Sequence, residues 1–399
     1  MRVININAVY GRLSTGRTVE QLNEGLKKYG VVSTTVFSAG PKNPKAHRMG
    51  SPWDVRLHSL LARVFGNSGY YSHIPTLGLL RYLDREKPDI VHLHNLHSNF
   101  ICLPMLFGYL AKNRIPAVVT LHDCWWFTGK CTHYTADGCT HRLTGCGHCP
   151  RLRKDIPSWL FDRSRRMLAD KRKWFESLPA YAVIGVSDWI TAEAKLSFMG
   201  SAKLVRRIYN WIDTELFSPT PSDIRSRYGL EGKYLILGVA GLWQNSKGLQ
   251  DFIRLARELP PEMRIVLIGA MPEERDLGGI VSIPLTENQR ELAEWYSAAD
   301  VFLTLSREES FGKVSAEALS CGTPVIAVGT TANPELVGRG CGVVISDTSP
   351  GAVLDAIARV RSVGKDKMLP TCREFALNSF GMEDRISDTL AVYNELIKE

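Results

Sequence analysis

Glu309-Ser-Phe-Gly-Lys-Val-Ser-Ala-Glu317 sets two carboxylates eight positions apart, with a Gly-Lys pair between them. The apolar run Val301–Ser306 before it is typical of a buried strand, and Ala316–Cys321 favours a helix. Gly312 and Lys313 would then precede that helix, where free N–H groups favour an anion. A phosphate site with a carboxylate on each side predicts a nucleotide-sugar site. The alternative is an ordinary loop glutamate and a solvated helix glutamate, so the rest of the chain has to decide.

Strand and helix patterns alternate along the chain, which predicts an α/β fold of parallel sheets covered by helices. The expected strands are Val3–Ala8, Val31–Phe37, Ile90–His94, Ala117–His122, Ala182–Val186, Tyr234–Ala240, Ile265–Gly269, Val301–Leu305, Val325–Val328 and Gly342–Ile345. The helices expected after the midpoint are Leu249–Leu259, Asn288–Ala298, Ala316–Cys321, Ala352–Val360 and a last one at about Glu383–Lys398. Two such runs meet near Asn210–Pro221. We therefore expect two Rossmann-like domains, 1–212 and 213–382, facing each other across a cleft.

The composition is that of a soluble protein, with 44% hydrophobic and 23% charged residues in a chain of 399. No apolar run approaches the roughly 20 residues of a membrane helix, and a strand begins at Met1-Arg-Val-Ile, so we expect a cytoplasmic protein. Residues 1–210 carry 30 Lys and Arg against 14 Asp and Glu, a net +16, and residues 211–399 carry 19 against 27, a net −8. A basic domain favours nucleic acid, a phosphorylated substrate or an anionic membrane face, or it serves solubility alone.

A glycine-rich stretch, Gly238-Val-Ala-Gly241, leads into Lys247-Gly248 between an expected strand and an expected helix. Glycines let the backbone approach a ligand closely, and a lysine at a helix start can neutralise a diphosphate. The spacing does not fit a Walker loop, because Gly-Lys-Ser/Thr is missing there. Alone this is a plain glycine-rich turn, but together with Glu309–Glu317 it predicts one donor site.

The first domain places polar residues at the ends of its expected strands. Ser14-Thr15-Gly16 is expected on a loop before a helix from Thr18, where it either closes over a phosphate or is a capped turn. His122 ends a strand, and Asp123 is placed to orient it. His94 and His97 follow another strand and are expected on the same, acceptor-side wall.

Taken together, these residues resemble the retaining glycosyltransferases of family 4, which have the GT-B fold. The resemblance spans nearly the whole chain and rests on Glu309-Ser-Phe-Gly with Glu317-Ala, Cys321-Gly-Thr-Pro-Val-Ile-Ala, Lys247-Gly248, Asn210-x-x-Asp213 and Ala299-Asp300-Val-Phe. In the first half, His94-Asn-Leu-His97 and Leu121-His-Asp-Cys-Trp-Trp-Phe-Thr-Gly129 are similar to bacterial enzymes of exopolysaccharide and colanic acid assembly.

The resemblance implies a role for each donor-side residue. Glu309 would bind hydroxyls of the donor sugar, and Glu317 would bind the nucleotide ribose. Lys247, with the amides of Gly312 and Lys313, would stabilise the leaving diphosphate. The sequence departs from the family in one positively charged residue. The family often has an arginine shortly before the lysine that corresponds to Lys247, and the stretch Gly241-Leu-Trp-Gln-Asn-Ser contains none.

For the first domain, the resemblance implies that Gly16 lies near the diphosphate and that His122 contacts the donor sugar beside the acceptor. It also implies that the C-terminal helix, 383–399, joins this domain. The implied activity is transfer of a hexose, with retention, from a UDP- or GDP-linked sugar to a saccharide acceptor. That acceptor is expected to be lipid-linked, in bacterial surface polysaccharide synthesis.

Two other functions are compatible with parts of the sequence. One is a different GT-B enzyme, either a sugar-nucleotide epimerase or a glycogen-type synthase. The other is a zinc-bearing nucleic-acid-binding protein, supported by the basic first half and a cysteine cluster. The net charge of −8 in the second half argues against the latter, so we expect no nucleic acid partner.

The mechanism is predicted from the placement of the carboxylates. A retaining hydrolase holds two carboxylates roughly 5 Å apart around the scissile bond, whereas Glu309 and Glu317 are assigned to opposite ends of the donor. We therefore expect front-face substitution, in which the leaving phosphate takes the acceptor proton. Residues 211–399 contain no Asp-x-Asp metal motif, so no catalytic divalent ion is expected.

Five of the nine cysteines lie in an expected insertion, 124–150, which is poor in strand patterns. Four of them follow the pattern Cys131-x7-Cys139-x6-Cys146-x2-Cys149, and a closing Cys-x-x-Cys is typical of zinc sites. Disulfides are disfavoured in a cytosol. The pattern therefore indicates either a structural zinc site or four reduced thiols, with the alternative ligands His133, His141 and His148.

Residues 151–178 carry nine Lys and Arg against four acids, with aromatic side chains interleaved. A basic helix of this kind either lies on an anionic membrane or is an ordinary surface helix with its aromatics in the core. Lipid-linked acceptors favour the first alternative, which would place the protein peripherally at the inner face of the plasma membrane.

Overall fold

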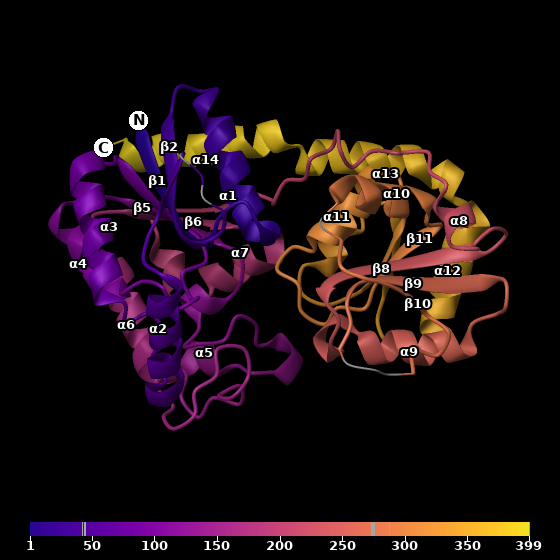
Figure 1. Ribbon diagram of the computed structural model, residues 1–399, viewed down its shortest axis with the longest axis horizontal. Helices are drawn as coiled ribbons and strands as arrows, with labels where there is room; N and C mark the ends of the chain where they lie inside the picture. The colour runs from indigo at the N-terminus through magenta and orange to yellow at the C-terminus, as the bar shows by residue number, and fades with distance from the viewer. Residues whose placement is uncertain (42, 44, 273–275, 287, 399) are drawn as a thin grey trace. The chain divides into compact units, whose positions relative to one another are not determined.

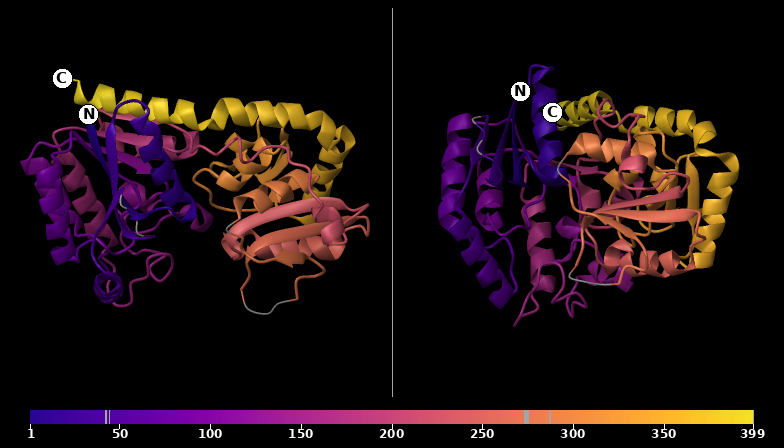
Figure 2. Two further views of the ribbon diagram at one scale, coloured as in Figure 1. Left: turned by 45° about the horizontal axis from the view of Figure 1, so that its top comes forward. Right: turned by 45° about the vertical axis from the view of Figure 1, so that its right-hand side comes forward.

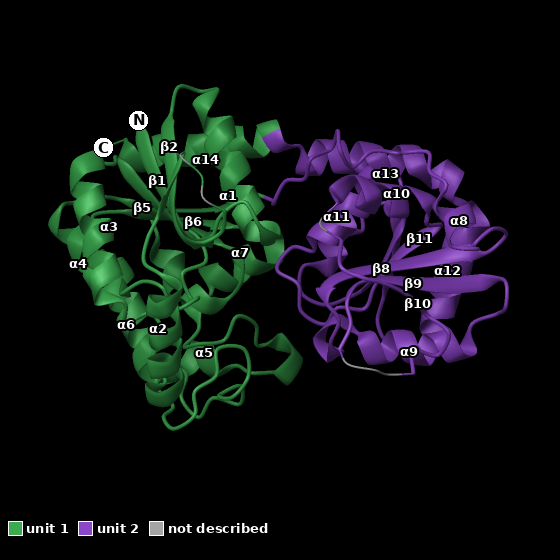
Figure 3. Cartoon of the chain, in the orientation of Figure 1, with its two compact units in different colours: residues 1–208, 383–399 green, residues 209–382 purple. Residues whose placement is uncertain are grey.

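The structure, a computed structural model, describes residues 1–41, 43, 45–272, 276–286 and 288–398. The chain divides into two compact units, unit 1 (1–208 with 383–399) and unit 2 (209–382) (Figure 3). Each unit is built on a parallel sheet with helices packed on its faces (Figures 1 and 2). The predicted α/β fold with two parallel sheets is therefore confirmed, and the unit boundary lies four residues before the expected one.

Unit 1 contains seven parallel strands in the order β3-β2-β1-β4-β5-β6-β7. They are β1 (Arg2–Val9), β2 (Val32–Ala39), β3 (Ala46–Arg48), β4 (Ile90–Leu93), β5 (Ala117–Leu121), β6 (Tyr181–Gly185) and β7 (Leu204–Arg207). Its helices are α1 (Leu13–Lys27), α2 (Pro52–Phe65), α3 (His73–Glu86), α4 (Leu103–Lys112), α5 (His141–Thr144), α6 (Ser164–Glu176), α7 (Asp188–Lys195) and α14 (Met382–Ile397). The central strands β4, β5 and β6 are wholly buried, because helices cover both faces of a parallel sheet.

The C-terminal helix α14 packs into unit 1 although it lies some 300 residues from the strands that it contacts. Tyr393 reaches His92 on β4, with 2.6 Å between its hydroxyl and the Nδ1 atom. Gly25 on α1 allows the close approach, since a Cβ there would stand 2.2 Å from the side chain of Ile386. The last helix therefore belongs to the core of unit 1.

Unit 2 contains six parallel strands in the order β10-β9-β8-β11-β12-β13. They are β8 (Tyr234–Leu242), β9 (Met263–Ala270), β10 (Val281–Ile283), β11 (Val301–Thr304), β12 (Val325–Val328) and β13 (Gly342–Ile345). Its helices are α8 (Ile224–Arg227), α9 (Leu249–Glu258), α10 (Gln289–Ala298), α11 (Lys313–Ser320), α12 (Pro350–Val363) and α13 (Lys365–Phe380). The order changes direction between β8 and β11, and ligands of such sheets bind beyond the strand ends at this point.

Two expectations about helices were wrong in their bounds. Helix α1 begins at Leu13, so Ser14, Thr15 and Gly16 lie in its first turns rather than on a loop. The Thr18 hydroxyl donates to the Ser14 carbonyl oxygen at 3.0 Å, so Thr18 lies inside the helix rather than at its start. Helix α11 begins at Lys313, three residues before the expected start.

The basic segment 151–178 is not one helix. Only Ser164–Glu176 is helical, as α6, and there Met167 and Phe175 are buried in the core. Trp159 and Phe161 precede the helix and are exposed. The segment thus divides into an ordinary core-packed helix and an exposed aromatic stretch. In the described part of the chain, no helix combines the length and apolar character that crossing a bilayer requires.

Candidate functional site

Lys247 and Glu309 form an ion pair where β8 and β11 end in unit 2. The Nζ atom of Lys247 lies 2.5 Å from Oε1 of Glu309, and both side chains are partly buried. The two loops that carry them are also joined through the backbone, since the Arg307 N–H donates to the Ser246 carbonyl oxygen at 3.0 Å. The structure therefore brings together the lysine and the first glutamate predicted for the donor site.

Protein packing requires glycine at one of two positions near Lys247 but not at the other. Gly248 has φ +78° and a Cβ there would stand 2.6 Å from the Leu305 carbonyl oxygen, so the close approach of the two loops requires glycine. Gly241 has nothing within 4 Å of where a Cβ would be. The packing of the protein explains Gly248, whereas the space at Gly241 is open to a ligand.

Helix α11 starts beside this ion pair and carries the second glutamate. Gly312 is its N-cap residue, with φ +91°, so the first N–H groups of α11 follow directly. Glu317 lies one turn further on, and its side chain is buried and accepts a hydrogen bond from the Tyr296 hydroxyl at 3.1 Å. Burial, and then the charge of Glu317, raise the pKa of Tyr296 well above its usual value, so this hydroxyl remains a donor. Unit 2 thus combines a helix N-terminus with two carboxylates and a lysine.

Arg307 adds a second positive charge beside Lys247. Its guanidinium lies 3.4 Å from Oδ2 of Asp251, and Arg254 pairs with the other oxygen of the same carboxylate. Both arginines are more than half exposed, but only Arg307 lies on the loop that ends in Glu309. Sequence reasoning overlooked Arg307 because it follows a different strand from Lys247.

The strand ends of unit 1 hold a network of polar side chains around three histidines. His94, which follows β4, lies 3.1 Å from His122 Nε2 through its Nδ1 and 3.2 Å from Asn5 Oδ1 through its Nε2. The Asn5 amide group donates to Asn23 and Ser33, which leaves its oxygen facing His94. His94 must therefore donate from Nε2 and accept at Nδ1 from the His122 N–H.

Burial keeps this network neutral. Burial, followed by the neighbouring histidines, lowers the pKa of His94 well below 6.5. The same causes lower the pKa of His92 to about 3, and its two nitrogens contact Tyr393 and Thr120. His122 is the more exposed end of this chain of hydrogen bonds.

The prediction that Asp123 orients His122 was wrong. Asp123 Oδ2 lies 2.9 Å from His97 Nε2, and its Oδ1 accepts from the Trp125 N–H at 2.8 Å. Burial alone would raise the pKa of Asp123, but His97 and the Trp125 N–H outweigh it and lower that pKa. Consecutive residues at the end of a strand point to opposite sides, so His122 and Asp123 serve separate pairs.

Gly16, the remaining predicted residue of unit 1, has a structural role. A Cβ at this position would stand 3.1 Å from the Val9 carbonyl oxygen, so glycine lets α1 pack closely on the end of β1. It lies in the first turns of α1, where N–H groups are available to an anion. Helix packing alone accounts for glycine here.

The four patterned cysteines meet at one small cavity inside the insertion. Cys131, Cys139, Cys146 and Cys149 all line it, together with His141, and all four are free thiols. As the side chains are placed, no group of three or more His, Cys, Asp or Glu in the described residues is arranged to hold a metal ion. His133 packs against Trp189, with 6.4 Å between ring centroids, and is not among the residues lining the cavity.

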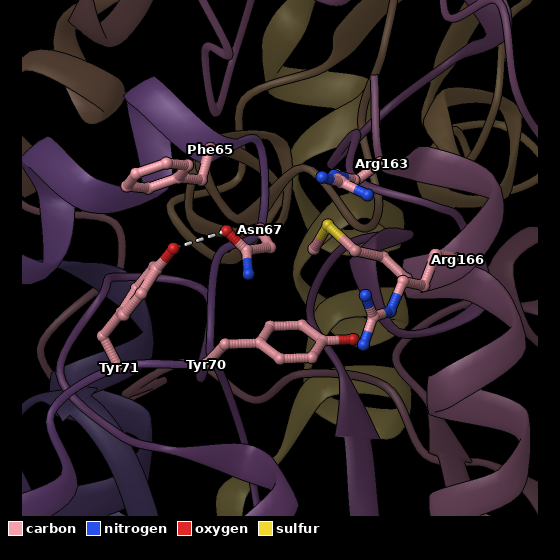
Figure 4. A pocket seen from close by; sticks show the side chains of 7 residues that line it. Phe65, Asn67, Tyr70, Tyr71, Arg163 and Arg166 are labelled. Atoms are coloured by element: carbon pink, nitrogen blue, oxygen red, sulfur yellow. Dashed lines mark hydrogen bonds between the residues drawn. The ribbon is translucent and has the colours of Figure 1, made fainter. Parts of the chain in front are cut away.

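A larger cavity of about 280 Å³ lies between the end of α2 and the start of α6 in unit 1. Figure 4 shows its aromatic walls and two arginine side chains on one side. The Tyr71 hydroxyl donates to Asn67, and the Tyr70 hydroxyl donates to Asp170 at 2.6 Å. Sequence reasoning missed this cavity because its walls come from segments about 100 residues apart.

Comparisons with known proteins agree with this geometry. A family model described as Glycosyltransferase Family 4 matches residues 15–216, and one described as Glycosyl transferases group 1 matches residues 233–362. WcaC of Escherichia coli (strain K12), named as a colanic acid biosynthesis glycosyl transferase, is 30% identical over 269 residues. The match covers 65% of this chain and 64% of that protein, so the chain spans just under two thirds of this relative's length.

Solved structures share the fold over nearly the whole chain. Sucrose-phosphate synthase from Thermosynechococcus elongatus has a TM-score of 0.69 at 16% identity, covering 99% of this chain and 98% of that one. HepE from Anabaena, in complex with UDP-glucose, has a TM-score of 0.66 at 16% identity, covering 98% and 100%. The two parallel-sheet units, the charged loops of unit 2 and the family match together show that this chain belongs to the glycosyltransferases of family 4, with the GT-B fold.

Proposed function

We propose that this protein transfers a hexose from a nucleotide diphosphate sugar to a saccharide acceptor, with retention of the anomeric configuration. The observation that carries the proposal is the Lys247–Glu309 ion pair beside the N-terminus of α11. Positive charge and the N–H groups at a helix N-terminus suit a diphosphate, and carboxylates suit sugar and ribose hydroxyls. Glu309 would bind the sugar, and Glu317 the ribose.

The reaction would proceed by front-face substitution at the anomeric carbon. The acceptor oxygen forms its bond to that carbon on the side from which the phosphate oxygen leaves. The proton of the acceptor hydroxyl passes to the leaving phosphate. Lys247, Arg307 and the first N–H groups of α11 stabilise the charge that develops on the diphosphate, so we propose that the transfer step uses no divalent ion.

His122 would contact a sugar hydroxyl in unit 1. His94 accepts at Nδ1 from the Nε2–H of His122 and so orients the His122 ring. The buried, neutral His94 fixes this tautomer. We propose that this arrangement binds an uncharged saccharide.

We further propose that the acceptor is lipid-linked and that the protein acts at an anionic membrane surface in surface polysaccharide synthesis. Support comes from an exposed apolar patch on α2 and the stretch before α6, formed by Trp53, Leu57, Leu60, Phe65, Trp159, Leu160 and Phe161. The two segments are contiguous, since Phe65 stacks on Phe161 and the Trp159 N–H donates to the Arg63 carbonyl oxygen. Arg56, Arg63 and Arg163 accompany the apolar side chains, as expected for a surface that contacts anionic lipid.

Related proteins support the same acceptor class. The name of WcaC refers to colanic acid biosynthesis, and WaaG, a glycosyltransferase involved in lipopolysaccharide biosynthesis, matches this fold at a TM-score of 0.67 and 13% identity. Both concern bacterial surface glycans. We infer that this chain handles an acceptor of that class.

The transferase proposal is tested by incubating the protein with UDP- and GDP-hexoses and an extract of lipid-linked saccharides. Transfer of labelled sugar from one donor is expected, and NMR of the product should show the same anomeric configuration as the donor. An inverted product would contradict the mechanism. Absence of transfer from every donor, with extracts that support a known transferase, would contradict the activity.

The membrane proposal is tested by sedimentation with vesicles. We expect binding to vesicles with anionic lipid, weaker binding to neutral ones, and loss of binding in a Trp53→Ser/Leu57→Ser/Leu60→Ser variant. Leu196→Ser, an equally exposed leucine elsewhere in unit 1, is the matched control and should bind normally. Binding that is unchanged in the triple variant would show that this patch does not face a membrane.

A further inference from the structure

The insertion between β5 and α6 contains a cavity that its four patterned cysteines share. Cys131, Cys139, Cys146 and Cys149 are separated by up to 18 positions in the chain, yet all four line the same free space of about 20 Å³. A volume of this size holds one particle no larger than about a water molecule. Four sulfur ligands around so small a space have the number and chemistry of a tetrahedral zinc site.

The backbone around the last two cysteines is shaped for anionic sulfur. Cys146, Gly147 and His148 have positive φ values of 57°, 95° and 48°, a run that L-residues rarely adopt without compensation. Burial raises the pKa of both thiols, and two N–H groups from outside this turn act in the opposite direction, that of Gly129 on Cys146 and that of Arg151 on Cys149. N–H donors stabilise a thiolate more than a thiol.

Two lysines of this region are buried, and one of them, Lys130, lines the cavity. Lys130 is 4% exposed and donates to the carbonyl oxygens of Arg151 and Leu152. Lys171 is 1% exposed and donates to the carbonyl oxygens of Trp125 and Thr128, with its Nζ 3.6 Å from the Trp125 ring centroid. Buried ammonium groups require nearby negative charge, and these hydrogen bonds end on neutral carbonyls.

We propose that Cys131, Cys139, Cys146 and Cys149 bind one structural Zn²⁺ as thiolates. A zinc ion with four thiolates carries a net charge of about −2, which offsets the charges of Lys130 and Lys171. The thiols as placed do not yet form a ligand set, so zinc would draw the four side chains into the cavity. His141 would support the site without binding zinc, because its Nδ1 donates to the Gly147 carbonyl oxygen at 3.0 Å and so stabilises the turn.

This site has no open coordination position, so its role is to fold the insertion rather than to take part in transfer. The insertion follows directly from His122 and Asp123 at the end of β5. Zinc would therefore fix the chain that leaves the acceptor side of unit 1. The inference does not depend on the proposed transferase activity, because metal binding is measured independently of it.

The first experiment measures metal in the intact protein purified without chelator and without an affinity tag that binds metal. One zinc per chain is expected, and titration with an organomercurial should release it into a colorimetric indicator as four thiols react. Replacement by Co²⁺ should give the visible absorption of a tetrahedral thiolate site. Zinc well below one per chain, even after growth with added zinc, or a cobalt spectrum without thiolate bands, would overturn the proposal.

Variants then assign the ligands. Cys146→Ser/Cys149→Ser should lose at least nine-tenths of the zinc, and Cys124→Ala should retain it, because Cys124 belongs to the same insertion but does not line the cavity. If the double variant fails to fold, the mercurial titration of the unaltered protein still decides the question. Retention of full zinc by a folded Cys146→Ser/Cys149→Ser protein would contradict the ligand set.

Discussion

The predicted site residues at the strand ends of unit 2 carry charge, whereas one group at the strand ends of unit 1, around His94, is buried and uncharged. In unit 2, Lys247 pairs with Glu309 beside a helix N-terminus. In unit 1, His122, His94 and Asn5 are linked by hydrogen bonds, and burial keeps His94 uncharged. Under the proposed function, unit 2 would bind an anionic nucleotide and unit 1 an uncharged saccharide.

The largest effect is expected from removing charge in unit 2. Glu309→Gln keeps the size of the side chain but removes the partner of Lys247, which then loses its fixed position. Misplacing a group at the reacting centre costs about 10²-fold in rate, so we expect turnover to fall by at least that factor. The exposed Glu258→Gln on α9 is the control and should be fully active. Equal rates for the two variants in a donor-turnover assay would contradict a catalytic role for Glu309.

The next prediction compares a glycine expected to face the ligand with a glycine required by the packing of the protein. Gly241→Ala should leave the melting temperature unchanged and weaken nucleotide binding by about tenfold, or 1.4 kcal/mol, because a Cβ there meets no protein atom. Gly248→Ala should instead destabilise unit 2 by about 1–3 kcal/mol, since its φ is +78° and Leu305 blocks the added atom. Calorimetry measures both quantities. If Gly241→Ala bound nucleotide normally, the donor would not occupy that space.

Two buried histidines of unit 1 lead to a prediction about pH. They are His92 on β4 and His58 on α2, whose Nδ1 atom lies 2.8 Å from the Ser72 hydroxyl oxygen. Burial lowers the pKa of His58 and of His92 to about 3 from 6.5, so the unfolded chain binds more protons than the folded one between these values. Their stabilising contribution is complete above pH 6.5 and is lost as the pH falls toward 3. Well below pH 6.5, each of these two histidines should lower the free energy of unfolding by about 1.4 kcal/mol for every further unit of pH.

Chemical denaturation between pH 7.5 and 5, followed by a probe in unit 1, measures the slope of the free energy of unfolding against pH. His92→Asn should be less stable at pH 7.5 but should lose less stability on acidification. His58→Asn should reduce this slope in the same way, because burial also lowers the pKa of His58. A slope that His92→Asn leaves unchanged would mean that His92 is charged or accessible in the folded protein.

The smallest effect concerns the second cation of unit 2. Arg307→Ala should raise the KM for the donor about two- to fivefold at low salt, and the difference should shrink with added salt, because exposed charges are screened. Arg254→Ala is matched to it, since both arginines pair with Asp251. If the two variants behave alike, the effect belongs to Asp251 rather than to a diphosphate contact.

Much of unit 2 could be predicted from the sequence because its site follows chain order. An apolar strand, a loop with Glu309 and a helix with Glu317 lie within 17 residues, 301–317, and local patterns are enough to place them. Arg307 was missed because its relation to Lys247 depends on two loops meeting in space. Helix α13 was missed because Pro370 lies inside it and reads as a helix end.

Unit 1 was harder to predict because its contacts join distant segments. Asp123 is adjacent to His122 in sequence, yet its partner is His97, since neighbouring residues at a strand end diverge. The exposed face of α2 was also missed. Trp53, Leu57 and Leu60 recur at helical spacing, which sequence alone cannot distinguish from a core-facing stripe.

The most direct test of the account is calorimetric titration of UDP and of GDP into the unaltered protein and into Glu317→Gln. The glutamine keeps an oxygen that can accept from the Tyr296 hydroxyl, so the fold of unit 2 should be preserved. The account predicts that one of the two nucleotides binds the unaltered protein and that Glu317→Gln weakens this binding at least tenfold. Equal binding to both proteins, or binding of neither nucleotide to the unaltered one, would contradict the assignment of unit 2 as the donor site.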